Sequence, residues 1–204
     1  MRADFAFERH GIVFIVSGPS GAGKSTLVAA LLARVPALTL SVSCTTRTPR
    51  AVEHDGREYF FVGVDEFTRR RDAGEFAEWA EVHGALYGTV RAPLDDAIAD
   101  GCDMLLDIDV QGARQLKRIY REAAVAVMVL PPSWDELERR LRARSTEDES
   151  TMLRRLARAR DEARALSDYD YWIVNADVEQ AVGQLEAIVR AERARVSRIV
   201  VEAT

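Results

Sequence analysis

The sequence predicts an α/β fold in which a parallel sheet is covered by helices. Short apolar runs alternate with longer amphipathic stretches, and this alternation is typical of strands joined by crossover helices. An apolar run at 12–17 also leads through a glycine-rich loop into a helical pattern. Strand, glycine loop and helix in this order indicate a P-loop, which binds phosphate groups.

The size and composition of the chain allow one α/β domain with inserted subdomains. Its 204 residues are 48% hydrophobic, which is enough for a packed core. Lysine and arginine number 28 against 33 aspartates and glutamates, so the net charge is −5. This balance gives no sign of a general nucleic-acid or membrane surface, and a substrate with several phosphates would need local basic clusters.

The cysteines and the first residues bear on cellular location. Cys44 and Cys102 lie in no disulfide-framework or zinc-ligand spacing. Residues 1–11 contain no apolar core of signal-peptide length, and no apolar run approaches the roughly 20 residues that span a bilayer. We expect a cytoplasmic protein.

The loop after the first strand, GPSGAGKS at 18–25, fits G-x-x-x-x-G-K-[ST]. Its glycines let backbone N–H groups surround phosphate oxygens at the positive end of the next helix. Lys24 can reach the β- and γ-phosphates, and the Ser25 hydroxyl can bind Mg²⁺. Arginine fills nearly every other basic position, and Lys117 is the second of only two lysines. A compact ammonium suits this crowded loop better than a guanidinium. The predicted ATP-binding residues here are Gly18, Pro19, Ser20, Gly21, Ala22, Gly23, Lys24, Ser25 and Thr26.

Further strands of the core sheet are expected at 104–109, 125–130 and 172–175. The first of these ends in Asp107 and Asp109. Ligands of open α/β sheets bind at the carboxyl edge, so we expect both acids to face the site.

The region 37–100 predicts an insertion with its own small sheet. Strand patterns lie at 39–43 and 58–62, and helical patterns at 64–71 and 93–99. A second insertion at 134–166 predicts Arg-rich helices with a break near 145–148, and 177–198 predicts one amphipathic helix. Most arginines of the second insertion are expected to be solvated partners of nearby glutamates.

Taken together, these motifs resemble the guanylate kinase family. The resemblance covers nearly the whole chain, in order and at the family's spacing, and is far more specific than the P-loop alone. The matching segments are GPSGAGKST, SVSCTTRTPR at 41–50, REYFFV at 57–62, EFAEWA at 75–80, YGT at 87–89, LLDIDVQG at 105–112, LxxRLxxR at 137–144 and IVNAD at 173–177.

The resemblance implies a single domain in three parts, and a reaction. A P-loop core of 1–36, 101–133 and 167–204 would bind ATP, a small α+β subdomain of 37–100 would bind GMP, and a helical lid of 134–166 would close over both. The enzyme would phosphorylate GMP, and dGMP, to GDP or dGDP with release of ADP, and would require Mg²⁺. No nucleic acid or membrane partner is expected, and the oligomeric state stays open.

The resemblance also assigns roles around the transferred phosphoryl group. Asp107 would hold Mg²⁺ through water together with Ser25, and Asn175 would lie near the adenine, although an ordinary loop asparagine is an alternative. The residues assigned to catalysis are Lys24, Arg47, Arg140, Arg144 and Arg155.

The acceptor site would combine guanidinium groups with one carboxylate. Arg47 and Arg50 present two forks that suit one phosphate. Guanine carries two donors at its N1 and 2-amino groups, so the ionised Glu78 would accept both, although periodicity alone indicates a surface glutamate. By resemblance the Tyr59 hydroxyl would help to bind the GMP phosphate, although the sequence alone indicates a core aromatic equally well. The implied GMP-binding residues are Ser43, Arg47, Arg50, Glu53, Tyr59, Glu78, Tyr87, Thr89 and Asp109.

Three alternative functions remain at this stage. A P-loop kinase for another phosphorylated small molecule would share the P-loop without the acceptor set. A non-catalytic guanylate-kinase-like domain that binds phosphopeptides typically has a degraded P-loop, whereas this one is intact. A nucleic-acid-binding P-loop ATPase would need a basic track, which a net charge of −5 does not indicate.

Overall fold

The computed structural model of the protein describes residues 8–82, 84–144 and 148–200, apart from the side chain of Arg144. Most of the predicted break near 145–148 therefore lies outside the described residues.

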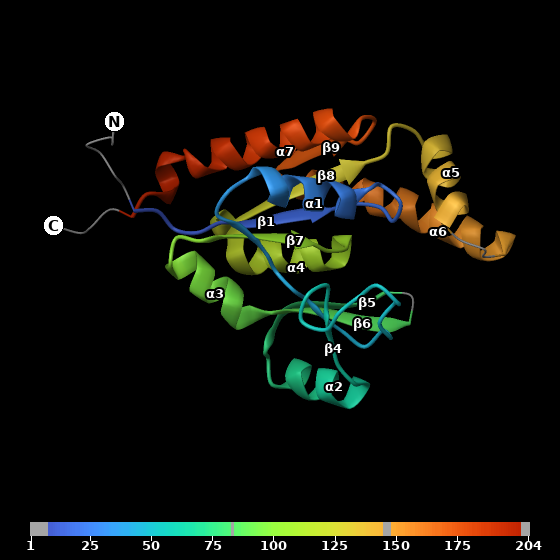
Figure 1. Ribbon diagram of the computed structural model, residues 1–204, viewed down its shortest axis with the longest axis horizontal. Helices are drawn as coiled ribbons and strands as arrows, with labels where there is room; N and C mark the ends of the chain where they lie inside the picture. The colour runs from blue at the N-terminus through green and yellow to red at the C-terminus, as the bar shows by residue number, and fades with distance from the viewer. Residues whose placement is uncertain (1–7, 83, 145–147, 201–204) are drawn as a thin grey trace.

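A parallel sheet forms the centre of the molecule, and β1 is its middle strand (Figure 1). Every residue of β1 is buried, because helices cover both faces of the sheet. This confirms the predicted α/β class. In spatial order the strands are β2 (Leu38–Leu40), β7 (Asp103–Asp107), β1 (Val13–Ser17), β8 (Ala124–Leu130) and β9 (Tyr171–Val174).

The alternation of β1 side chains divides the core into two layers. Phe14 belongs to the cluster that also contains apolar residues of α1 (Lys24–Arg34) and α7 (Val178–Arg193). Its neighbour Ile15 belongs to the other cluster, with apolar residues of α3 (Arg91–Ala99) and α4 (Val110–Tyr120). Alternate β1 side chains thus lie on opposite faces of the sheet, and each face packs against the apolar side of its own helices. This packing fixes the position of the helices on the sheet.

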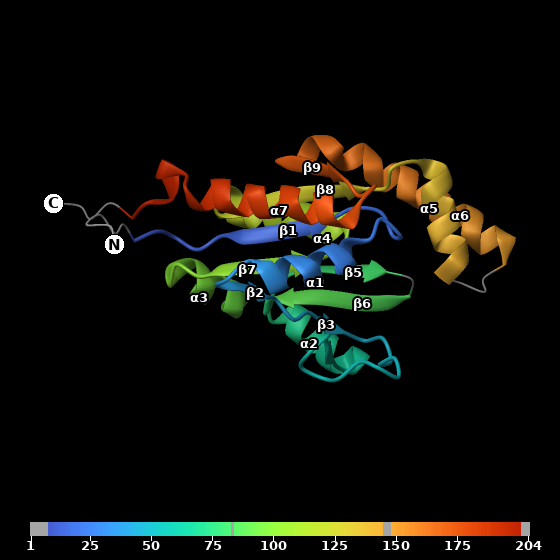
Figure 2. The ribbon, with the colours of Figure 1, turned by 45° about the horizontal axis from the view of Figure 1, so that its top comes forward.

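A second, mixed sheet lies below the core sheet and carries α2 (Val64–Asp72) on its outer side (Figure 2). The α2 helix is anchored where the rings of Phe67 and Phe76 stack at 4.5 Å. The strands are, in order, β4 (Phe60–Phe61), β3 (Cys44–Thr45), β6 (Ala85–Val90) and β5 (Phe76–Val82).

Three sequence predictions differ from this arrangement. The single helix predicted at 177–198 is α7, which ends at Arg193, and a separate 3-10 turn follows at Val196–Arg198. The predicted strand 39–43 was expected in the small sheet, but β2 ends at Leu40 and pairs with β7 in the core sheet. The predicted strand 104–109 ends at Asp107, because Asp109 accepts a hydrogen bond from the Gly112 N–H and caps α4.

Two helices extend beyond the carboxyl edge of the core sheet: α5 (Trp134–Arg144) and α6 (Glu149–Ala163). They pack on each other through Leu137, Leu141 and Met152. No helix within the described ranges is long and apolar enough to cross a membrane. The remaining helical segments are the 3-10 turns η1 (Arg121–Ala123), η2 (Arg164–Asp168) and η3 (Val196–Arg198).

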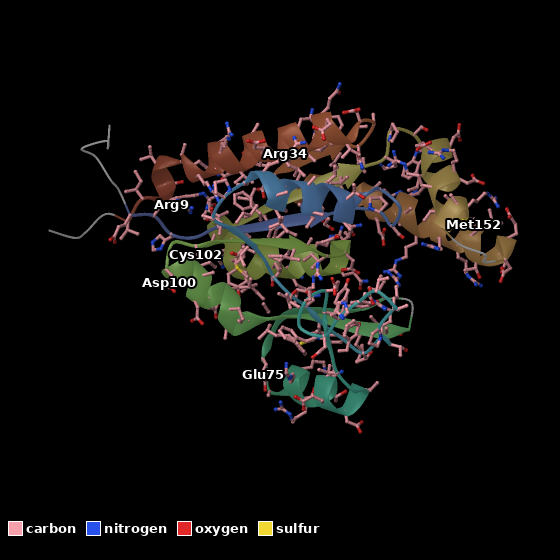
Figure 3. All side chains as sticks on the ribbon, viewed as in Figure 1. Arg9, Arg34, Glu75, Asp100, Cys102 and Met152 are labelled. Atoms are coloured by element: carbon pink, nitrogen blue, oxygen red, sulfur yellow. The ribbon has the colours of Figure 1, made fainter. Side chains whose placement is uncertain are left out.

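A buried ion cluster closes the end of the molecule opposite these helices. The Asp103 side chain is fully buried and accepts from both Arg9 Nη atoms at 2.7 and 2.8 Å. It also accepts from Arg193 Nε at 2.6 Å and from the Ile12 N–H at 3.0 Å. Figure 3 shows Arg9 at this end and Met152 at the far end.

Replacing Asp103 with Ala should lower the free energy of unfolding by about 3 kcal/mol, because two partly buried guanidinium groups lose their counter-charge. Urea unfolding of the purified protein measures this. Asp100→Ala, at an exposed position nearby, is the control and should change stability by less than about 0.5 kcal/mol. Equal stability of the two variants would contradict a role of the cluster in folding.

Candidate active site

A cleft of about 310 Å³ lies between the carboxyl edge of the core sheet, the small sheet and α6. The P-loop forms one end of this cleft, and side chains of β5 and β6 form the other. The structure brings most of the predicted residues together here. Those that line the cleft are Gly18, Ser20, Gly21, Gly23, Lys24, Ser25, Thr26, Ser43, Tyr59, Glu78, Tyr87, Asp107, Asp109 and Arg155.

The P-loop conformation depends on glycine at its junction with α1. Gly23 is the N-cap of α1 with φ at 93°, in the left-handed region. A Cβ at this position would lie 2.3 Å from Asn175 Nδ2. The Lys24 ammonium donates to the carbonyl oxygens of Gly18 at 2.6 Å and Pro19 at 3.2 Å, which keeps it over the loop.

Ser25 and Asp107 meet beside the P-loop, where the Ser25 hydroxyl donates to Asp107 Oδ2 at 2.7 Å. Mg²⁺ is usually held by one or two protein oxygens together with phosphate oxygens and water. This pair of oxygens fits that requirement. Among the described residues, no cluster of three or more His, Cys, Asp or Glu side chains is arranged to hold a metal by itself.

Arg47 is held in place by its neighbours. Glu53 accepts from its Nη1 and Nη2 at 3.0 and 2.9 Å, and Nε donates to the Tyr87 hydroxyl at 3.2 Å. The hydrogen bond to Glu53 raises the pKa of Arg47. Glu53 also accepts from the Arg50 N–H at 2.7 Å. Its carboxylate therefore supports the loop that carries both arginines, whereas the Arg50 side chain is exposed.

Glu78 lies on the wall of the cleft although it is only 4% exposed. A β-bulge between Phe76 and Glu78 changes the strand register. Phe76 therefore packs against Phe67 of α2, whereas Glu78 lines the cleft. The Thr89 hydroxyl donates to Glu78 Oε1 at 2.5 Å, and Ser43 Oγ lies 3.4 Å from Thr89 Oγ1.

Burial raises the pKa of Glu78 to about 7, and the nearby Asp109 carboxylate adds to the rise. Hydrogen bonds from Thr89 act in the opposite direction. This group therefore changes between an acid and a carboxylate close to neutral pH.

The predicted basic residues of α5 and α6 approach the P-loop from outside. Arg155 donates to Ser20 Oγ at 3.1 Å. Arg140 donates to the carbonyl oxygens of Ala22 at 3.4 Å and Asn175 at 3.1 Å. The side chain of Arg144 lies outside the described part of the chain.

Asn175 is 3% exposed and lies against the P-loop. Its Nδ2 donates to the Ala22 carbonyl oxygen at 2.8 Å, so it supports the loop from behind. Its predicted place near the adenine stays a prediction.

Sequence reasoning missed several residues at the cleft. Arg158 and Glu162 line it, and neither was singled out. A signal existed for Arg158, because it follows Arg155 by three residues on a helix and so shares its face. Gly112 is the last residue of the LLDIDVQG motif and has no other signal in the sequence. A Cβ there would lie 2.4 Å from Glu78 Oε2, so Gly112 makes room for the carboxylate.

The parallel sheet and the P-loop at its carboxyl edge place the chain among the P-loop nucleotide-binding folds, with a second sheet facing the phosphate site across the cleft. The family model for guanylate kinase matches residues 11–192. A guanylate kinase of Aromatoleum aromaticum is 52% identical over 91% of this chain and 90% of its own length. The chain belongs to the guanylate kinase family, and it is an enzyme of that class.

Two further relatives agree with this assignment. A guanylate kinase of Nitratidesulfovibrio vulgaris is 53% identical over 88% of this chain and 86% of its own. The crystal structure of guanylate kinase from Anaplasma phagocytophilum matches with a TM-score of 0.82 and 36% identity, covering 96% of this chain and 93% of the other. These comparisons give no support to the alternative functions considered from the sequence.

Replacing Gly112 with Ala should weaken GMP binding about tenfold while the fold is kept, because the new methyl group displaces a flexible carboxylate rather than backbone. Calorimetric titration with GMP measures the change. Gly183→Ala is the matched helical control: a Cβ at that position would have no neighbour within 4 Å, so GMP binding should not change. Equal GMP affinity in both variants would contradict the spatial role of Gly112.

Proposed function

We propose that this chain transfers the γ-phosphoryl group of ATP directly to the phosphate of GMP, releasing GDP and ADP, and that it accepts dGMP in the same way. The observation that carries this proposal is one continuous cleft with a P-loop at one end and the buried Glu78 at the other. Membership of the guanylate kinase family supports it.

The P-loop end would bind ATP. Backbone N–H groups of the loop and the Lys24 ammonium would surround its phosphates, and Thr26 follows at the start of α1. Ser25 would hold Mg²⁺ directly and Asp107 through water. When bound, this ion would neutralise negative charge on the ATP phosphates.

The opposite end would bind GMP. Arg47, kept in position by Glu53, would grip the GMP phosphate together with Arg50 and the hydroxyl groups of Tyr59 and Tyr87. An ionised Glu78 would accept from the two guanine donors. The remaining base contacts are assigned to Ser43, Thr89 and Asp109.

An oxygen of the GMP phosphate would attack the γ-phosphorus of ATP, the new P–O bond forming as the bond to the ADP oxygen breaks. No protein nucleophile is needed, so catalysis consists of alignment and charge stabilisation. Lys24, Arg47, Arg140, Arg144 and Arg155 would supply the positive charge.

The three-part division follows from these roles. Residues 37–100 would carry the GMP-binding subdomain, although β2 and α3 within this range belong to the core. Residues 134–166 would act as a lid that excludes water from the ATP phosphates. The other residues would form the ATP-binding core. We place the reaction in purine nucleotide metabolism of the cytoplasm, in keeping with the free thiols of Cys44 and Cys102.

The experiment that tests this function is a coupled ADP-release assay with ATP and Mg²⁺. GMP and dGMP should be turned over, whereas AMP and UMP should not. Folded protein that leaves GMP unconverted would overturn the proposal. Turnover of AMP or UMP in preference to GMP would favour a different P-loop kinase.

Replacing Lys24 with Ala should reduce kcat by a factor of about 10³, because the loop loses its ammonium where charge builds up. The same ADP-release assay measures it, and circular dichroism checks that the fold is kept. Lys117→Ala is the control for removing a lysine elsewhere, and it should retain its kcat. A Lys24 variant with near-normal kcat would remove this residue from its assigned role.

Replacing Glu78 with Gln should raise KM for GMP about 10- to 100-fold and leave KM for ATP unchanged, because guanine loses an acceptor. The wild-type kcat/KM for GMP should rise with pH through about 7, since the buried acid must first ionise. The GMP phosphate titrates in the same range, so the ratio of wild type to variant is the quantity to follow. A pH-independent ratio would contradict the ionised form of Glu78 as the acceptor.

A further inference from the structure

Arg158 is a cleft residue to which the mechanism above gives no role. It lies on α6, and its Nη2 lies 3.8 Å from Asp109 Oδ2. Its Nε donates to Glu162 Oε1 at 2.9 Å, one helical turn further along. All three side chains line the cleft. Arg158 therefore links the second insertion to the residue that caps α4.

The two carboxylate oxygens of Asp109 have different partners, and only Oδ2 lies near Arg158. Asp109 Oδ1 accepts from the Gly112 N–H at 2.9 Å as the cap of α4. Oδ2 faces Arg158 and accepts a longer hydrogen bond of 3.3 Å from Gln111 Nε2. The backbone thus fixes one oxygen, and the guanidinium of Arg158 lies beside the other.

The contact between Arg158 and Asp109 bears on Glu78, because Asp109 is one of the charged groups near it. Asp109 is the charged group that opposes ionisation of Glu78. On the other sides, Thr89 of β6 donates to Glu78, and the phenols of Tyr59 and Tyr87 line the same end of the cleft. From α6 come the cations Arg155 and Arg158 and the anion Glu162, while Lys24 and Asp107 lie at the P-loop end.

We propose that Arg158 is a positioning residue for guanine recognition: aimed by Glu162, it orients the Asp109 carboxylate and offsets its negative charge at the base-binding end of the cleft, close to the buried Glu78. This inference rests on the proposed function. It places a specificity contact on α6, which otherwise faces the ATP phosphates.

A surface ion pair between Arg158 and Glu162 alone would contribute only a few tenths of a kcal/mol to helix stability. Such a pair would not change the affinity for GMP. The contact with Asp109 is different, because it joins two separate elements across the cleft and lies beside a buried carboxylate whose charge state decides what it can accept.

Three variants test the proposal: Arg158→Gln removes the charge, Arg158→Lys keeps it, and Arg154→Gln is the control. Arg154 is an exposed residue of the same helix that donates to Thr151 Oγ1 at 2.7 Å. Steady-state kinetics with GMP, with ATP and as a function of pH are measured for each, together with GMP affinity by calorimetry.

We expect Arg158→Gln to raise KM for GMP about tenfold, with kcat within about twofold and KM for ATP unchanged. Its kcat/KM profile, divided by that of the control, should shift to higher pH by about 0.5 units, since the lost positive charge disfavours the ionised form of Glu78. Arg158→Lys should restore most of the GMP affinity.

Two results would overturn the inference. One is a GMP affinity and pH profile of Arg158→Gln equal to those of Arg154→Gln. The other is a loss confined to kcat or to KM for ATP, which would assign Arg158 to the transferred phosphoryl group instead. Failure of the proposed function is distinguishable, because the wild-type protein itself would then leave GMP unconverted.

Discussion

The burial of one carboxylate, Glu78, is the constraint on which the proposed acceptor end of the site depends. An acid removed from water tends to stay protonated, and a protonated acid accepts poorly from guanine. The neighbouring features compensate for this tendency: Thr89 donates to one oxygen, Gly112 leaves space beside the other, and the bulge before Glu78 turns it to the cleft. A carboxylate shielded from water discriminates between bases more sharply than one in water, because a base without hydrogen-bond donors leaves it unsatisfied.

The two ends of the cleft manage charge differently. Arg47 is fixed by paired hydrogen bonds to Glu53, so little side-chain entropy would be lost if it binds the GMP phosphate as proposed. Lys24 instead rests on carbonyl oxygens of its own loop, and its flexible stem can exchange these for phosphate oxygens. A rigid guanidinium suits the phosphate that accepts the phosphoryl group, because that phosphate must be aligned. A mobile ammonium suits the phosphoryl group that moves during transfer.

Much of this structure could be predicted from sequence, since the predictive signals were local. The P-loop between β1 and α1, the buried strands and the Arg-rich helices each have a pattern contained in a short stretch. The bulge in β5 has none, because one extra residue breaks the period of two and makes Glu78 look like a surface residue. The pairing of β2 with β7 and the contact of Arg158 with Asp109 join segments far apart in the chain, so the sequence alone did not indicate them. The role of Glu53 was assigned to GMP by resemblance, whereas its visible partners are Arg47 and the Arg50 N–H.

The buried cluster at Asp103 also joins the two extremities of the described chain. Arg9 and Arg193 share this carboxylate, and the Val200 N–H donates to the Glu8 carbonyl oxygen at 2.9 Å beside them. The two ends of the described chain therefore lie side by side, at the end of the molecule opposite α5 and α6 (Figure 1). A circular permutant joined at this point and opened in a surface turn would keep every strand pairing, so the order in which the elements are connected is separable from the architecture that forms the cleft.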